Sequence, residues 1–142
     1  MNGDVELLNY IYQNSEMGKD TIQQLMEISK NDEFNKLLNS QFEEYKMIND
    51  KTAEIIKEHS KQPKEINVLS KASTYIVINL KTLTDKSPSH ISEMLIQGST
   101  MGIIDITKKI KEYSTSDNEI IALANKLLEF EQRNVEECKK YL

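Results

Sequence analysis

Tryptophan is absent from this chain of 142 residues, and cysteine occurs only once, at Cys138. A single cysteine excludes an internal disulfide and any metal site built from several thiolates. The chain has only two prolines and four glycines, and this shortage of turn-forming residues argues against an all-β fold with many hairpins. No apolar run approaches the roughly 20 residues that a membrane-spanning helix needs, so we expect no membrane partner.

An excess of positive charge is also missing. The 18 Lys and Arg residues are outnumbered by 23 Asp and Glu residues, which gives a formal net charge of −5. Because binding to nucleic-acid phosphates requires a basic surface, we predict no nucleic-acid partner. The N-terminus, Met1–Glu6, lacks the basic region and following apolar region of a signal peptide. We therefore expect a cytoplasmic protein.

Helix-forming residues are abundant, and apolar residues recur with helical spacing. The predicted helices cover residues 4–29, 33–59, 66–83, 88–112 and 118–141 of a single domain, 1–142. Ser87 followed by Pro88 marks the start of the fourth helix. Within the third, Tyr75–Ile78 is β-branched enough to suit a short strand. We predict a helix there because no partner strand is visible elsewhere.

The connections between these segments predict a topology. Short breaks make the first two helices antiparallel neighbours, and likewise the last two. The long connection in the middle contains its own helix and can traverse the bundle, which leaves 33–59 and 88–112 parallel. Two hairpins joined by one long crossover form the ferritin-like arrangement. We therefore predict an all-α, ferritin-like four-helix bundle with a helical crossover.

Two strings in the chain resemble a known group of proteins. They are LLNYIYQNSEMGKD at Leu7–Asp20 and EMLIQGSTMGIIDITKK at Glu93–Lys109. Both are similar to short, uncharacterised bacterial proteins, mostly from Gram-positive genomes, and the resemblance spans nearly the whole chain. The resemblance to ferritins themselves is one of architecture, which by itself implies no function.

Several polar residues fall on the apolar faces of these helices when each helix is drawn at about 100° per residue. Glu131 lies at the centre of the last helix's apolar stripe. With a rise of about 1.5 Å per residue, the crossover arrangement brings Glu44 and Glu131 to within roughly 3 Å in height. We predict two buried polar layers, one of Glu44, Glu131 and Gln41, and one of Asp105 and Asn14.

Core carboxylates raise the question of a metal ion. Ferritin-like di-iron sites use a Glu from each of two helices and a Glu-x-x-His motif from each of the other two. Neither His59 nor His90 has a glutamate three residues before it, so we expect no full di-iron site. One interpretation is that Glu44 and Glu131 form a hydrogen-bonded pair in which one carboxyl stays protonated. The alternative is a depleted site in which they hold one Fe, Mn or Zn ion.

Glycines interrupt the apolar stripe of the fourth helix. Gly98 and Gly102 lie four residues apart on one face, and each costs up to about 1 kcal/mol relative to Ala. Close packing against a neighbour would compensate for that cost. We predict that both are closely packed, that Gly18 faces the same place, and that Tyr45 or Tyr12 fills the gap.

No motif of enzymatic chemistry is visible. The chain has no phosphate-binding glycine loop, no Cys–His pair and no plausible Ser–His–Asp arrangement. We therefore expect a non-catalytic cytoplasmic helical bundle without a cofactor, in a structural or protein-interaction role, with a second copy of itself as the candidate partner. The alternative function is metal binding by a degenerate relative of ferritin-like proteins, through the core carboxylates.

Overall fold

The computed structural model describes residues 3–59 and 83–142, in which all regular secondary structure is helical. The helices are α1 (Asp4–Ile28), α2 (Asp32–Glu58), α4 (Pro88–Glu112) and α5 (Asn118–Lys139). Each boundary lies within about two residues of its prediction, so the all-helical fold class is confirmed for the described ranges. The predicted third helix, including Tyr75–Ile78, lies outside the described residues except for Leu83, which is not helical.

Side chains just before α2 and α4 fix where these helices begin. The Asn31 side chain accepts a hydrogen bond from the Phe34 backbone N–H at 2.8 Å. Ser87 Oγ accepts one from the His90 backbone N–H at 3.2 Å. Each bond satisfies an N–H group that a helix start leaves without an intrahelical partner. Pro88 follows in the first turn of α4, so the predicted start of this helix is confirmed.

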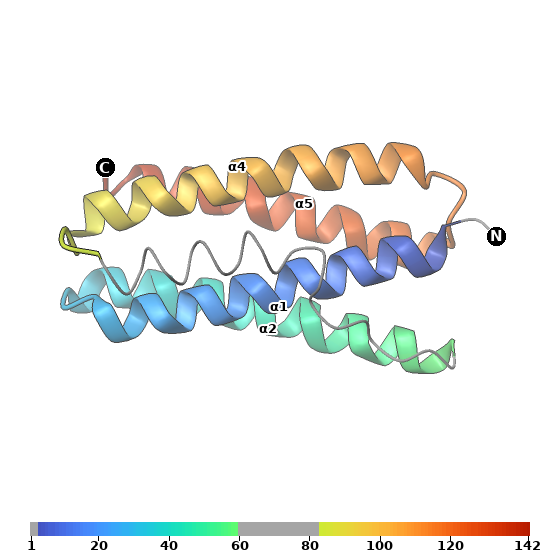
Figure 1. The fold of residues 1–142 in the computed structure, drawn as a ribbon, viewed down its shortest axis with the longest axis horizontal. Coiled ribbons are helices and arrows are strands. Elements are labelled where there is room, and N and C mark those ends of the chain that lie inside the picture. The colour runs from blue at the N-terminus through green and yellow to red at the C-terminus, as the bar shows by residue number, and fades with distance from the viewer. Residues whose placement is uncertain (1–2, 60–82) are drawn as a thin grey trace.

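The helices form two antiparallel hairpins, α1 with α2 and α4 with α5 (Figure 1). The most extensive contacts lie within each hairpin, and the hairpins touch through α1 with α4, α1 with α5 and α2 with α5. Figure 1 shows that α2 and α4 run in the same direction, because α2 ends at the opposite end of the bundle from the start of α4. Residues 60–82, which connect them, lie outside the described residues.

The core runs along the bundle and draws side chains from all four helices. The ring of Phe130 meets Tyr45 edge-on at 4.7 Å between centroids, and Phe34 meets Tyr141 at 4.9 Å. Burying one large apolar side chain contributes roughly 1.5–3 kcal/mol, so these stripes are what hold the hairpins together. Other large side chains that are fully buried are Leu7, Ile11, Ile22, Leu25, Leu38, Ile48, Ile55, Ile56, Ile91 and Ile106.

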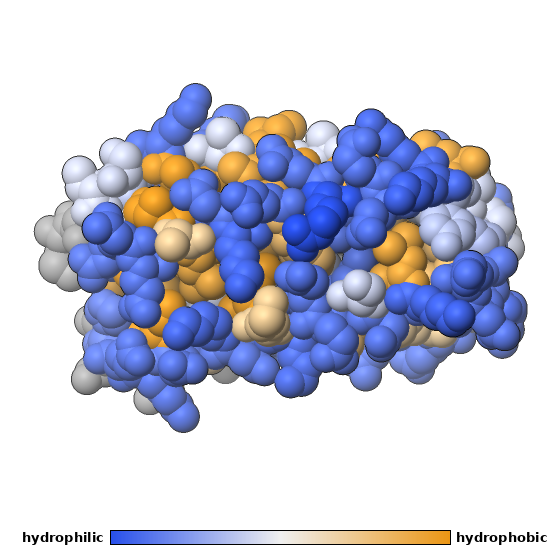
Figure 2. Space-filling model, turned by 180° about the vertical axis from the view of Figure 1, so that it is seen from behind, coloured by the Kyte–Doolittle hydropathy of each residue, from blue (hydrophilic) through white to orange (hydrophobic). Residues whose placement is uncertain are grey.

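Hydrophilic side chains cover most of the face seen in Figure 2, and hydrophobic groups show between them only in patches. The large hydrophobic residues that are exposed in the described ranges are Met47, Met101, Ile104 and Leu142. None of the helices in these ranges combines the length and the apolar character that crossing a membrane requires.

Candidate functional site

Glu131 lies in the interior of the bundle, as its place on the stripe of α5 predicts. Only 2% of its surface is exposed. One turn earlier Leu127 is fully buried, and almost one turn later Asn134 is 2% exposed, so α5 presents the carboxyl to the core. A carboxyl removed from water is stable only when it is neutral or well hydrogen-bonded. Its partners therefore decide what it can do.

Two hydroxyl groups donate to the same oxygen of this carboxyl. The Tyr45 hydroxyl donates to Glu131 Oε1 at 2.5 Å, and Ser99 Oγ donates to it at 3.3 Å. Tyr45 comes from α2 and Ser99 from α4, and both side chains are buried. The amide of Asn134 also lies beside the carboxyl. These four residues, which we call the Glu131 cluster, link the two hairpins across the core.

Two glycines make room for this cluster. A Cβ atom on Gly102 would collide with Glu131 Oε2, and one on Gly18 would lie 2.5–2.8 Å from three ring atoms of Tyr45. Real Cβ atoms essentially never come that close to another heavy atom. The predicted close packing is therefore confirmed at Gly18 and Gly102, and Tyr45 is the side chain that fills the gap at Gly18.

The same prediction is wrong for Gly98. A Cβ atom there would have nothing within 4 Å, and the residue is exposed. Four residues turn a helix by about 400°, so Gly98 is rotated by about 40° around α4 relative to Gly102. That rotation takes it out of the packed interface and onto the lining of a cavity.

The cavity has a volume of about 110 Å³, is partly open, and lies between α1 and α4. Tyr45 and Glu131 reach it from the other two helices, so they form its floor, and most of its remaining walls are apolar. The residues that line it are Asn14, Met17, Gly18, Thr21, Ile22, Leu25, Tyr45, Met94, Leu95, Gly98, Ser99 and Glu131. A concave apolar space with a few convergent polar groups is the usual form of a small-ligand site.

Burial sets the protonation behaviour of the cluster. It raises the pKa of Glu131 from 4.5 to about 7, while the hydrogen bonds of Tyr45 and Ser99 and the amide of Asn134 act in the opposite direction. Burial, followed by the charge of Glu131, raises the pKa of Tyr45 well above its ordinary value. Tyr45 therefore stays protonated and donates, while Glu131 changes between acid and carboxylate near neutral pH.

The predicted pairing of Glu44 with Glu131 is wrong. The Glu44 side chain is 30% exposed, and its Oε1 accepts a hydrogen bond from Arg133 Nη2 at 3.1 Å. One residue along a helix corresponds to a turn of about 100°, so Tyr45 rather than Glu44 faces the carboxyl. The prediction therefore placed the partner of Glu131 within one residue of its true position along α2, but on the wrong side of that helix.

Of the other polar residues that were predicted to be buried, two are buried and one is exposed. Gln41 is buried as predicted, but its amide approaches Cys138 Sγ at 3.5 Å instead of a carboxyl. Asn14 is also buried and lines the cavity. The prediction is wrong for Asp105, which is exposed, because α4 turns the next residue, Ile106, into the core. The predicted layer of Asp105 with Asn14 is therefore not formed.

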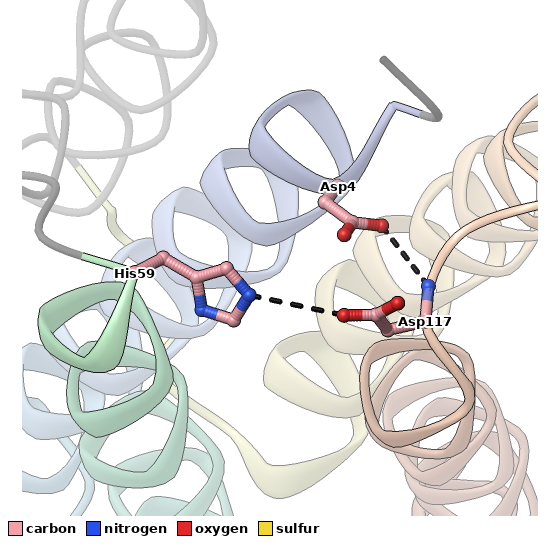
Figure 3. Close-up of side chains that lie close together, drawn as sticks. All are labelled: Asp4, His59 and Asp117. Atoms are coloured by element: carbon pink, nitrogen blue, oxygen red, sulfur yellow. Dashed lines mark hydrogen bonds and ion pairs between the residues drawn. The ribbon is translucent and has the colours of Figure 1, made fainter.

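A second group of ligand-type side chains was not predicted. Asp4, His59 and Asp117 each bring one nitrogen or oxygen atom to within 4.8 Å of the others (Figure 3). Nowhere else in residues 3–59 and 83–142 do three or more such side chains meet. All three residues stand at helix ends, where an apolar stripe carries no information, so spacing along the sequence could not have revealed the group.

Comparison of the chain with protein-family models, with curated proteins and with solved structures finds no match. Two features of the geometry bear on function. One is a titratable carboxyl at the floor of a partly open apolar cavity, and the other is a separate group of two carboxylates and an imidazole at the end of the bundle.

Proposed function

We propose that this protein is a non-catalytic binding protein, and that its bundle holds a small ligand in the cavity between α1 and α4. The proposal keeps the expectation of a non-catalytic protein and puts small-ligand binding in place of the expected structural or protein-interaction role. We propose further that the bundle is ferritin-like in topology, which the parallel course of α2 and α4 supports (Figure 1).

The observation that carries the proposal is the carboxyl of Glu131, which is 2% exposed and lines the cavity. Its pKa of about 7 compares with an ordinary 4.5, so keeping it ionised costs about 3 kcal/mol. An amide or apolar side chain in a purely structural core would avoid that cost. A carboxyl whose pKa is strongly shifted by burial and that lies beside a cavity is typical of a functional site, and its ionised form would attract a positively charged group.

The size and lining of the cavity indicate the class of ligand. Its volume of about 110 Å³ is somewhat less than that of an engineered apolar cavity of about 150 Å³ that binds benzene. A hydrocarbon group about the size of benzene would be surrounded by the apolar side chains of Met17, Leu25, Met94 and Leu95. An ammonium group or another hydrogen-bond donor at the end of that hydrocarbon group would contact Glu131. We therefore propose a small alkyl- or arylamine, or a larger molecule that inserts such a group.

Titration with benzylamine, a cation at pH 8, tests this proposal, and toluene serves as a neutral probe of similar shape. We expect saturable binding of benzylamine by NMR chemical-shift perturbation, centred on residues that line the cavity. Glu131→Gln should remove most of the preference for benzylamine over toluene, because the charge attraction is lost.

A filled-cavity variant supplies the second arm of the test. Gly98→Leu should weaken both probes, since the new side chain enters the cavity without meeting any atom within 4 Å at its Cβ. The matched control is Gln97→Leu, which adds the same side chain at an exposed neighbouring position that does not line the cavity. Failure of either probe to bind, or equal binding in Gly98→Leu and Gln97→Leu, would refute the proposal.

The alternative function, metal binding by the core carboxylates, requires Glu44 and Glu131 to bind the same ion. Glu44 instead forms an ion pair with Arg133, whose Nη2 lies 3.1 Å from Glu44 Oε1. The Tyr45 hydroxyl occupies the neighbourhood of the Glu131 carboxyl in its place. A role in holding Fe, Mn or Zn is therefore better sought at the end of the bundle than in its core.

A further inference from the structure

Three helix ends that are far apart in the sequence meet at one end of the bundle (Figure 3). Asp4 is the first residue of α1, His59 is the C-cap of α2, and Asp117 is the N-cap of α5. One ligand-type atom from each lies within 4.8 Å of the other two. None of the three residues lines the cavity, so this group of side chains is independent of the proposed ligand site.

A backbone contact holds the imidazole of His59 in one orientation. Its Nδ1 lies 2.9 Å from the carbonyl oxygen of Ile55, and because a carbonyl only accepts, Nδ1 carries a hydrogen and donates. The other ring nitrogen, Nε2, faces Asp117, whose Oδ2 is 3.9 Å away. Histidines that bind metals commonly donate from one ring nitrogen to a carbonyl in this way, which leaves the other nitrogen for the ion.

Asp117 is the N-cap residue of α5, but its carboxylate does not accept the hydrogen bond that N-cap side chains usually accept. The side chains of Asn31 and Ser87 cap their helices with hydrogen bonds of 2.8 and 3.2 Å. Asp117 makes no such bond to α5, and its own backbone N–H donates to Asp4 Oδ1 at 3.0 Å. Its carboxylate is directed instead toward the ring of His59 (Figure 3).

The contact between His59 and Asp117 requires a positive charge between the two groups. The lone pair of a neutral His59 ring at Nε2 would face the Asp117 carboxylate. Either a proton on Nε2 or a cation between the groups removes that repulsion. The separation of 3.9 Å between Nε2 and Asp117 Oδ2 is too long for a direct hydrogen bond, whereas an ion bound by both atoms fits between them.

We propose that Asp4, His59 and Asp117 bind one divalent transition-metal ion of the Zn²⁺ type, with water completing its coordination. Imidazole nitrogen and carboxylate oxygen bind such ions at about 2.0–2.2 Å, which places ligand atoms roughly 3–4 Å apart. The present separations, all within 4.8 Å, would shorten to this range by small rotations of the Asp4 and Asp117 side chains, while the His59 ring stays in place. Because the ligands come from α1, α2 and α5, the ion would tie both hairpins together.

The test uses the full chain at pH 7.5, titrated with Zn²⁺ by calorimetry and with Co²⁺ by its visible absorption. We expect one saturable site, the absorption of four-coordinate Co²⁺, and a rise in melting temperature, since an ion bound only by the native state stabilises it. His59→Gln and Asp117→Asn should each lower the affinity by about tenfold or more. Circular dichroism of the metal-free variants checks that they fold.

His90 provides the matched control, because the chain has two histidines in all. Its Nδ1 lies 3.4 Å from Glu93 Oε1, so it also stands beside a carboxylate. His90→Gln should leave the Zn²⁺ affinity unchanged. The proposal is overturned by any of three results: no saturable binding up to about 1 mM Zn²⁺, equal affinity in His59→Gln, or loss of binding in His90→Gln. The first would indicate that His59 and Asp117 form only an ion pair with a protonated ring.

Discussion

Asp117 starts α5 at the end of the bundle, and Glu131 lies about 21 Å further along the same helix. The first carboxylate is exposed beside another carboxylate and an imidazole. The second is 2% exposed and receives hydrogen bonds from Tyr45 and Ser99. One helix thus holds two acidic groups in opposite environments, water at its end and a low-dielectric core at its middle.

Burial decides what each of these two carboxyl groups can do. Asp117 is exposed at the end of the helix and is therefore accessible to cations that approach from solvent. In the core, burial raises the pKa of Glu131 to about 7, so its charge becomes a variable that a ligand or a change of pH can set. The glycines show the same contrast, because Gly18 is pressed against the Tyr45 ring while Gly98 faces open space.

The pH dependence of stability should show this contrast most strongly. The pKa of Glu131 is raised from 4.5 to about 7 on folding, so its protonated form favours the folded state. That stabilising contribution is complete below pH 4.5 and is lost as pH rises to about 7, a change of about 3 kcal/mol. Glu131→Gln, which does not titrate, should remove this part of the dependence in urea unfolding from pH 4 to 8.

Glu44→Gln is the control for that experiment, since it makes the same change at a partly exposed carboxylate. It should leave the slope between pH 4.5 and 7 in place. A wild-type slope that persists in Glu131→Gln would show that the buried carboxyl is not its source, and the contrast between the two environments would fail.

Gly18→Ala should have a smaller effect, though still a large one. The new Cβ would lie 2.5 Å from Tyr45 Cε1, so the ring must shift, and with it the hydroxyl that donates to Glu131. Overpacking of this kind costs about 1–3 kcal/mol, which exceeds the gain in helix propensity. Chemical denaturation would measure it, and unchanged or increased stability would contradict the close packing of α1 against Tyr45.

Gly98→Ala should act in the opposite direction. Because nothing lies within 4 Å of its Cβ, the substitution brings only the better helix propensity of Ala, worth up to about 1 kcal/mol. The same denaturation experiment therefore compares one chemical change at a packed and at an open position. Destabilisation by Gly98→Ala would place that residue in an interface after all.

The surface ion pair between Arg133 and Glu44 should matter least. The two side chains are 53% and 30% exposed, and exposed pairs contribute about 0–1 kcal/mol, which added salt weakens further. A double-mutant cycle with Arg133→Gln and Glu44→Gln should give a coupling energy of a few tenths of a kcal/mol. A coupling energy well above 1 kcal/mol would contradict the conclusion that this ion pair lies at the solvent-exposed surface.

The helices were predictable because their apolar stripes and the Ser87–Pro88 start are local signals, and burial of Glu131 followed from its place on such a stripe. The partners of Glu131 were not predictable in this way. A helical wheel gives the direction of a side chain only to within one or two positions over a long helix, so it indicates Glu44 as the partner of Glu131 where the structure has Tyr45. Contacts between helix ends, such as Asp4 with Asp117, depend on how the hairpins dock and leave no pattern in the sequence.

Glu131 should behave as a buried carboxyl that titrates near neutral pH beside a cavity, and its own titration is the most direct test. Carbon-detected NMR of glutamate-labelled protein follows its side-chain carboxyl, and the signal can be assigned by its absence from Glu131→Gln. We expect a titration midpoint of about 7, displaced downward by saturating benzylamine, because a bound cation favours the ionised form. A midpoint near the ordinary 4.5, unaffected by the amine, would contradict both the burial of this carboxyl and its role in the cavity.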